Sequence, residues 1–247
     1  MTCLAAVACL ASVEWSGMLA YNTLVVAAGT AAVGFAAGVV GSLGVLRKRA
    51  LVGDAAAHVT LVGVAAAFAV SGRRDLPLLL AGGFVAALAG LAALVLVRRF
   101  TRTRDDAATA IVLSVGFGGG IAIVSGMTAR GVPGSAGLEQ FLLGHTAALT
   151  AADAAVLAAI SAAAVAVVTL LLKEATLVAF DASFAAASGW PVTVIDYLLV
   201  LLVAVMVVVG LPAAGAVLVT ALVVIPPVAA RQWTDRVGTM LVLAAVF

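Results

Sequence analysis

The chain has 247 residues, 65% of them hydrophobic and only 10% charged, with a formal net charge of +2 and a mean hydropathy of +1.29. This composition excludes an ordinary soluble domain, which needs far more polar surface to cover its core. The small net charge and the lack of a basic stripe argue against nucleic-acid binding. Because the apolar stretches are continuous rather than alternating, the sequence predicts an all-α, polytopic transmembrane helical bundle.

Residues 1–22 are predicted to form an N-terminal lead-in at the membrane interface, with Glu14 and Trp15 at headgroup level. The whole chain, 1–247, is predicted to be a single transmembrane domain. Because Phe247 falls about halfway through the last apolar segment, we interpret that segment as a span whose remainder is missing from the sequence. The eight expected spans are 23–46, 51–71, 77–98, 108–128, 153–172, 193–211, 213–230 and one from about 237.

The arginines and lysines predict the orientation, because inner loops of membrane proteins carry the excess of positive charge. If the first span runs from outside to inside, the outer loops hold only Arg73, Arg74 and Arg130. The N-terminus is therefore expected outside. The inner loops then hold Arg47, Lys48, Arg49, Arg98, Arg99, Arg102, Arg104, Lys173, Arg231 and Arg236.

Two connecting segments are too long to be simple turns. The outer segment, 129–152, is rich in glycine and too polar to span, and we expect a partly helical cap or re-entrant piece. The inner segment, 174–191, is expected to form a short helix on the cytoplasmic surface. Asp181 is suited to begin it and Gly189 to end it.

Asp54 and His58 are ionisable residues inside an apolar run, where charged groups are costly to keep. At a spacing of four residues they share one helix face, about 6 Å apart along the axis. A carboxylate and an imidazole together are half of a plausible divalent-metal site. A purely structural role for both residues stays open at this point. The helix dipole favours a carboxylate such as Asp54 near the start of a helix, and His58 would be an interior histidine whose hydrogen bonds are satisfied within the protein.

Other candidate chemistry is weaker. The sequence contains no G-x-S-x-G, H-E-x-x-H or G-x-x-x-x-G-K-[ST] motif, so an intramembrane enzyme or a self-sufficient nucleotide hydrolase is disfavoured. His145 is expected in the outer segment, more as a loop residue than as a ligand. Asp196 is interpreted as an interfacial cap. The spacings Gly34–Gly38 and Gly116–Gly120 predict close helix packing.

Several stretches, in order, resemble the manganese/zinc/iron permease family of bacterial ATP-binding-cassette importers. The run from Leu46 to His58 resembles the family signature, in which a basic inner turn precedes Gly-Asp and, after a short spacer, His. Segments 105–125 and 137–144 resemble its fourth span and its outer segment. Phe180–Pro191 resembles the coupling segment of the family, and Ile225–Arg231 resembles its Thr-Pro-Ala-Ala-Thr-Ala-Arg end. The resemblance extends from about residue 22 to 247.

This resemblance implies a permease of the metal-chelate/cobalamin importer type, which is not itself an enzyme. Its partners would be a second permease copy or paralogue, two cytoplasmic ATP-binding subunits and an extracellular metal-binding protein, in the lipid of the bacterial inner membrane. Asp54 and His58 would bind the transported ion, with Mn²⁺ as the first candidate and Zn²⁺ or Fe²⁺ as the others. No permanent cofactor is expected. Coupling to the ATPase would involve Phe180, Asp181, Phe184 and Gly189.

The chain departs from the family pattern at four positions. Ala57 replaces a common serine and Val62 a common proline, both close in sequence to the proposed ion site. Pro227 replaces an alanine, and His145 stands where glutamine is frequent.

Two other functions remain open from the sequence. One is a proton- or ion-coupled secondary transporter that uses Asp54 and His58 as a relay, although no inverted repeat is visible. The other is a structural membrane subunit with no substrate path.

Overall fold

A computed structural model describes residues 15–47, 50–72, 75–133, 143–144 and 149–247. Within these ranges it contains ten helices and no strand. The helices are α2 (Trp15–Leu46), α3 (Ala50–Ser71), α4 (Leu76–Phe100), α5 (Asp105–Ala129), α7 (Ala151–Leu170), α8 (Leu172–Phe180), α9 (Ala182–Ala187), α10 (Val192–Ala214), α11 (Ala216–Trp233) and α12 (Val237–Val246).

Seven of these helices are long and apolar enough to cross a membrane, and they coincide with the first seven predicted spans. The prediction of an all-α membrane bundle is therefore confirmed. The eighth segment begins at Val237 as predicted, but α12 is a shorter apolar helix of 10 residues. The first helix starts earlier than its predicted span, since α2 already begins at Trp15 within the expected lead-in.

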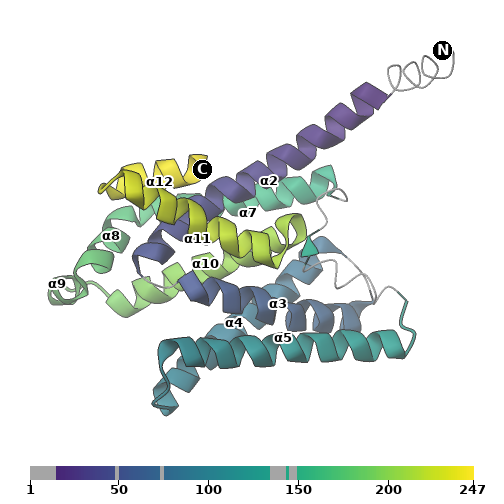
Figure 1. Cartoon of the computed structure of the whole chain (residues 1–247), viewed down its shortest axis with the longest axis horizontal. Helices are drawn as coiled ribbons and strands as arrows, with labels where there is room; N and C mark the ends of the chain where they lie inside the picture. Colours follow the sequence, from purple (N-terminus) through teal and green to yellow (C-terminus); the bar gives the residue numbers. More distant parts are fainter. Residues whose placement is uncertain (1–14, 48–49, 73–74, 134–142, 145–148) are drawn as a thin grey trace.

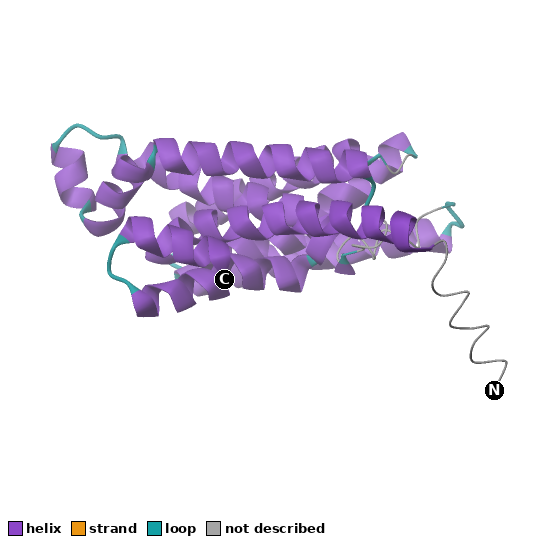
Figure 2. Cartoon of the chain, turned by 90° about the horizontal axis from the view of Figure 1, so that it is seen from above, coloured by secondary structure: helices purple, strands orange, loops and turns teal. Residues whose placement is uncertain are grey.

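The long helices lie roughly side by side and alternate in direction (Figures 1 and 2). The connections predicted to be inner, α2–α3, α4–α5 and α11–α12, lie at the same end of the bundle as α8 and α9 (Figure 1). The first described turns of α2 lie at the opposite end. The alternation that underlies the predicted topology is thus present in the fold.

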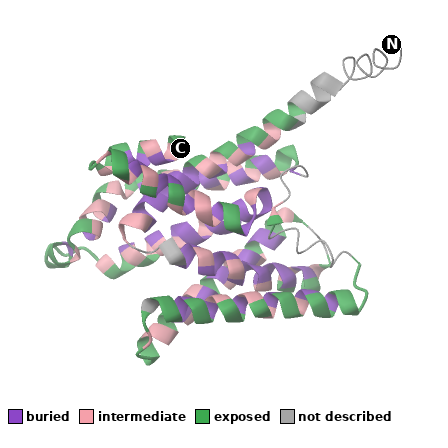
Figure 3. Ribbon diagram, in the orientation of Figure 1, coloured by how far each residue is buried: buried purple, intermediate pink, exposed green. Residues whose placement is uncertain are grey.

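The bundle has two packing groups that meet at α10 and α11. Helix α2 packs against α7, α10, α11 and α12, whereas α3 packs against α4, α5, α10 and α11. Within its most apolar stretch, α3 has 67% of its residues buried, against 22% for α4. Figure 3 shows the contrast between this covered interior and the outer surface of α5. Helix α3 is therefore a central helix, and α4 and α5 flank it.

Local sequence explains where several helices begin and end. Thr150 and Asp153 form a reciprocal capping box at the start of α7. Between α10 and α11 the chain reverses at Gly215, whose φ of 80° is accessible to glycine at little cost. The predicted break near residue 212 was therefore three residues early. Pro212 lies inside the last turns of α10 instead.

Small residues allow the helices around α3 to approach closely. A side chain at Gly116 or Gly120 of α5 would collide with Val59 or Leu61 of α3. The packing role predicted for this glycine pair is confirmed. In the other pair, Gly38 lies directly against α12, but a side chain at Gly34 would meet no other atom within 4 Å. Only half of the Gly34–Gly38 prediction is therefore confirmed.

Candidate functional site

Asp54 and His58 lie one turn apart on α3, near the end of the bundle that carries α8 and α9. The Nε2 atom of His58 is 3.6 Å from the Oδ1 atom of Asp54. The Asp54 side chain is 45% exposed and the His58 side chain 24% exposed. The predicted shared face is thus observed. It remains partly open, although most of α3 is covered.

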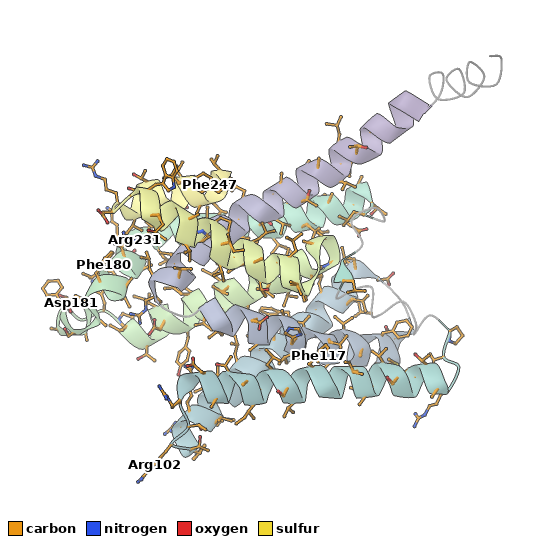
Figure 4. All side chains as sticks on the ribbon, viewed as in Figure 1. Arg102, Phe117, Phe180, Asp181, Arg231 and Phe247 are labelled. Carbon is orange, nitrogen blue, oxygen red and sulfur yellow. The ribbon has the colours of Figure 1, made fainter. Side chains whose placement is uncertain are left out.

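The His58 imidazole is oriented by an aromatic neighbour. Its ring meets Phe117 of α5 edge to face, with centroids 5.1 Å apart and an interplanar angle of 79°. Figure 4 shows Phe117 between α5 and α3. The Nδ1 atom of His58 is buried and has no hydrogen-bond partner among the described residues. A buried polar atom without a partner is costly in a finished protein core.

The alternative role of Asp54 as a helix cap is not supported. Asp54 is the fifth residue of α3, beyond the N-cap position. In the described part of the chain, the contact of its carboxylate is with His58, one turn further along the helix. The carboxylate therefore retains lone pairs for another ligand.

Within the described ranges, no group of three or more His, Cys, Asp or Glu side chains is close enough to hold a metal ion. Asp54 and His58 thus provide one oxygen donor and one nitrogen donor. Divalent transition metals in proteins usually take four or more ligands. A complete coordination shell would need further donors from water or from a second chain.

The two departures from the family pattern beside the pair fall on different faces of α3. Ala57 is fully buried and belongs to the main core with residues of α2 and α10. Val62 lies one turn beyond His58 on the same face, where it approaches Gly119 of α5. Of the two positions, Val62 is the one that continues the face of the pair.

The inner segment forms two short helices, α8 and α9, joined at Asp181 (Figure 4). As predicted, Asp181 caps α9: its Oδ1 atom accepts hydrogen bonds from Ser183 Oγ at 2.6 Å and from the Phe184 N–H at 2.8 Å. These two bonds stabilise the carboxylate and lower the pKa of Asp181 below its ordinary value. Gly189 has a φ of 84° just after α9, as expected for a helix stop.

Arg47 ties this inner segment to the spans. It follows the last residue of α2, and its Nε atom donates to Asp196 Oδ1 of α10 at 2.7 Å. A second contact joins Arg47 Nη2 to the same oxygen. The Nη1 atom donates to the carbonyl of Val178 in α8 at 2.8 Å. Arg47 and Asp196 are 17% and 25% exposed. The interpretation of Asp196 as an interfacial cap is therefore wrong, because its carboxylate pairs with a distant arginine.

Sequence reasoning missed two of these residues. Arg47 was counted only as part of a basic turn, and Phe117 was not considered. Neither contact has a local signal, since Arg47 and Asp196 are 149 residues apart.

His145 and most of the outer segment 129–152 lie outside the described residues, so their predicted roles stay predictions.

Comparisons with known proteins agree with this architecture. Residues 20–247 match the model of the ABC 3 transport family. The chain is 39% identical over 232 residues to the manganese transport system membrane protein MntC of Bacillus subtilis (strain 168), covering 94% of this chain and 53% of that protein. It is 36% identical to the zinc transport system membrane protein TroC of Treponema pallidum (strain Nichols), covering 92% and 76%.

The fold is also similar to a solved structure, PsaBC from Streptococcus pneumoniae in complex with Fab. The TM-score is 0.79 at 25% identity, and the match covers 90% of this chain and 76% of that one. The chain spans about half the length of its manganese relative from B. subtilis. From the family match over nearly its whole length, together with the seven membrane-spanning helices, the chain belongs to the ABC 3 transport family.

Proposed function

We propose that the chain is the transmembrane permease subunit of an ATP-driven importer of divalent transition-metal ions, Mn²⁺ first and Zn²⁺ or Fe²⁺ as the other candidates. The observation that carries this proposal is the Asp54–His58 pair, a partly open carboxylate and imidazole on the most covered span. Ionisable residues inside membrane spans face water-filled paths or protein partners, because lipid cannot solvate them. The names of the manganese and zinc relatives support the same substrate class.

The pair acts as half of an ion site on the axis of a permease dimer. Two copies supply two carboxylates and two imidazoles, a mixed oxygen and nitrogen set that suits Mn²⁺, Fe²⁺ or Zn²⁺. The exposed side of Asp54 and the partly exposed ring of His58 beside it are the groups that an ion on this face could contact. Binding at such a site is transient, since the ion must also leave it.

The energy for transport comes from separate cytoplasmic ATP-binding subunits, which dock on α8 and α9. Phe180 and Phe184 are 61% and 58% exposed there. Exposed aromatic side chains on a surface helix are typical of a protein contact. The bond from Arg47 to the Val178 carbonyl gives a rigid link from this contact to α2 and, through Asp196, to α10. Alternating access then follows from movement of α8 and α9.

The proposed orientation in the inner membrane has the N-terminus outside and α8 and α9 in the cytoplasm, as the distribution of arginine and lysine indicates. An extracellular metal-binding protein delivers the ion at the opposite end of the bundle.

The test is uptake of radioactive Mn²⁺ by cells that lack other manganese importers and express the complex. Asp54→Ala and His58→Ala should each abolish uptake while the permease still assembles with its ATPase. Ser71→Ala, at the other end of α3, is the matched control and should transport normally. Normal uptake in both site variants would refute the ion site.

The same experiment separates the alternative of a proton-coupled secondary transporter. An ATP-driven importer stops when the ATPase subunit carries an inactivating substitution, and it continues for a time after the proton gradient is collapsed. A secondary transporter shows the opposite dependence. Uptake that persists without a functional ATPase would therefore favour the proton-relay role of Asp54 and His58.

A further inference from the structure

A groove of about 880 Å³ opens on the side of the bundle, between the last turns of α4 and the first turns of α10. Val52 of α3 and Leu94 of α4 are buried in its floor. Its outer parts are open, with Leu96 and Tyr197 each 53% exposed. Both α4 and α10 are long and apolar enough to cross a membrane, so the groove lies on the membrane-facing surface of this chain. Its volume lies in the range of roughly 300–1,000 Å³ that is typical of ligand sites.

The lining of the groove is divided by polarity along the membrane normal. The α4 residues from Leu88 to Leu96 that line it are aliphatic or alanine, and so are Val200 and Leu201 of α10. The polar side chains that line the groove gather at the end near α8 and α9, where α4 finishes and α10 begins; they are Arg98, Arg99, Thr193, Asp196 and Tyr197. Apolar walls with one polar end match a phospholipid whose headgroup lies at the α8 and α9 end of the bundle and whose acyl chains extend toward the membrane centre.

The charged residues that line the polar end are two arginines and one aspartate. Asp196 is the acidic residue in the groove lining, and its carboxylate is already engaged by Arg47. Arg98 and Arg99 add two guanidinium groups beside it. Guanidinium groups bind phosphate through charge-assisted, often bidentate, hydrogen bonds. Basic pockets between spans on the cytoplasmic side are recognised sites for anionic headgroups. A divalent cation, in contrast, would be repelled.

We propose that this groove is a binding site for one anionic phospholipid. Arg98 and Arg99 hold the phosphate, the Tyr197 phenol lies at headgroup level, and an acyl chain runs along the aliphatic side chains of α4 and α10. The lipid lies between α4 and α10, which already pack directly against each other elsewhere along their length. This proposal is independent of the transported ion, because no residue of the groove belongs to the Asp54–His58 pair.

The experiment is native mass spectrometry of the purified full chain in detergent, titrated with phosphatidylglycerol, phosphatidylcholine or inorganic phosphate. Phosphatidylglycerol should remain bound, and Arg98→Gln/Arg99→Gln should weaken its binding roughly tenfold or more, given about 1 kcal/mol for each basic residue near a membrane surface. Arg102→Gln/Arg104→Gln is the matched control, since both arginines are exposed in the α4–α5 connection outside the groove. That control should bind phosphatidylglycerol like the unmodified chain.

A second variant tests the acyl chain without changing charge. Val95→Trp places a large side chain in the open part of the groove, and it should also weaken phosphatidylglycerol binding. Size-exclusion chromatography checks that each variant is folded, and Arg99→Gln alone serves if the double variant is not. Equal binding of phosphatidylglycerol and phosphatidylcholine, equal losses in the loop control, or displacement by inorganic phosphate would each overturn the proposal. Cross-linking of Leu96→Cys between two permease copies would also overturn it, by making the groove a subunit interface.

Discussion

Asp54 and Asp196 are both carboxylates in spanning helices near the same end of the bundle, yet their surroundings differ. Asp196 is 25% exposed and receives the Nε–H of Arg47 at 2.7 Å, and the same arginine also binds the Val178 carbonyl. Asp54 is 45% exposed, and its neighbour His58 is 3.6 Å away, beyond ordinary hydrogen-bond distance. One carboxylate is hydrogen-bonded to an arginine through its Oδ1 atom, whereas the other has His58 beside it at a longer distance.

The difference separates a structural ion pair from a binding site. A partly buried charge that serves only stability is expected to be paired and hydrogen-bonded, because its desolvation is otherwise uncompensated. Asp54 and His58 do not meet this condition, since His58 Nδ1 is buried without a partner among the described residues. Groups left unsatisfied by their own fold are those that can still gain free energy from a ligand. The first three of the four predictions that follow test this distinction.

The largest expected effect is on transport by Asp54→Asn. This change keeps the size of the side chain but removes the anionic ligand. Mutation of a residue that only hydrogen-bonds to a metal ligand typically lowers metal affinity or activity by roughly 10–100-fold, so the loss of Mn²⁺ uptake in Asp54→Asn should be larger than that. The unfolding midpoint in detergent should stay close to that of the unmodified protein. Asp196→Asn is the comparison, and it should lower the unfolding midpoint more than Asp54→Asn does. A reversed pattern would exchange the two roles assigned to these carboxylates.

The next effect is on stability. Arg47→Gln leaves the Asp196 carboxylate without its cation and the Val178 carbonyl without its donor, and should cost about 2 kcal/mol of unfolding free energy. Unfolding of the purified protein in mixed micelles measures this cost. The reversed pair, Arg47→Asp with Asp196→Arg, should recover part of it. If Arg47→Gln unfolds like the unmodified protein, the three-way contact does not stabilise the bundle.

A smaller effect is expected at Phe117. Phe117→Leu removes the edge-to-face contact with His58 but keeps an apolar side chain. Because such aromatic pairs contribute about 0.5–1.5 kcal/mol, the apparent affinity for Mn²⁺ should weaken by roughly 2- to 10-fold. Concentration-dependent uptake gives this affinity. Phe84→Leu, on α4, is a matched control of the same type, and the prediction fails if both variants behave alike.

The smallest effect concerns pH at the start of α9. The folded-state pKa of Asp181 is lowered by the bonds from Ser183 and Phe184, so the cap stabilises α9 above the unfolded-state pKa of about 3.9. This stabilisation is lost as the pH falls through the lowered pKa. Amide hydrogen exchange over residues 182–187 should therefore be slow at neutral pH and rise under acid conditions relative to Asp181→Asn, which keeps a good cap without titrating. An unchanged ratio across this pH range would contradict the prediction.

The spans and the face shared by Asp54 and His58 could be predicted because both depend on local geometry. A bilayer about 30 Å thick fixes the length of an apolar run, and a spacing of four residues fixes a common helix face. The cap at Asp181 and the stop at Gly189 were also confirmed, since each depends on a few neighbouring residues. The chain reversal at Gly215 was placed only approximately, because Pro212 is compatible with the last turns of α10.

The sequence by itself determined a bundle of apolar helices, the side on which basic connections gather, and one face that carries a carboxylate and an imidazole. These properties follow from composition and from contacts within a few residues. Only the tertiary structure decided that Arg47 binds Asp196 and α8, that Phe117 meets His58, and that Arg98 and Arg99 border a groove beside α10. Each of these contacts joins different helices, and helix packing selects among many partners that local patterns leave equal.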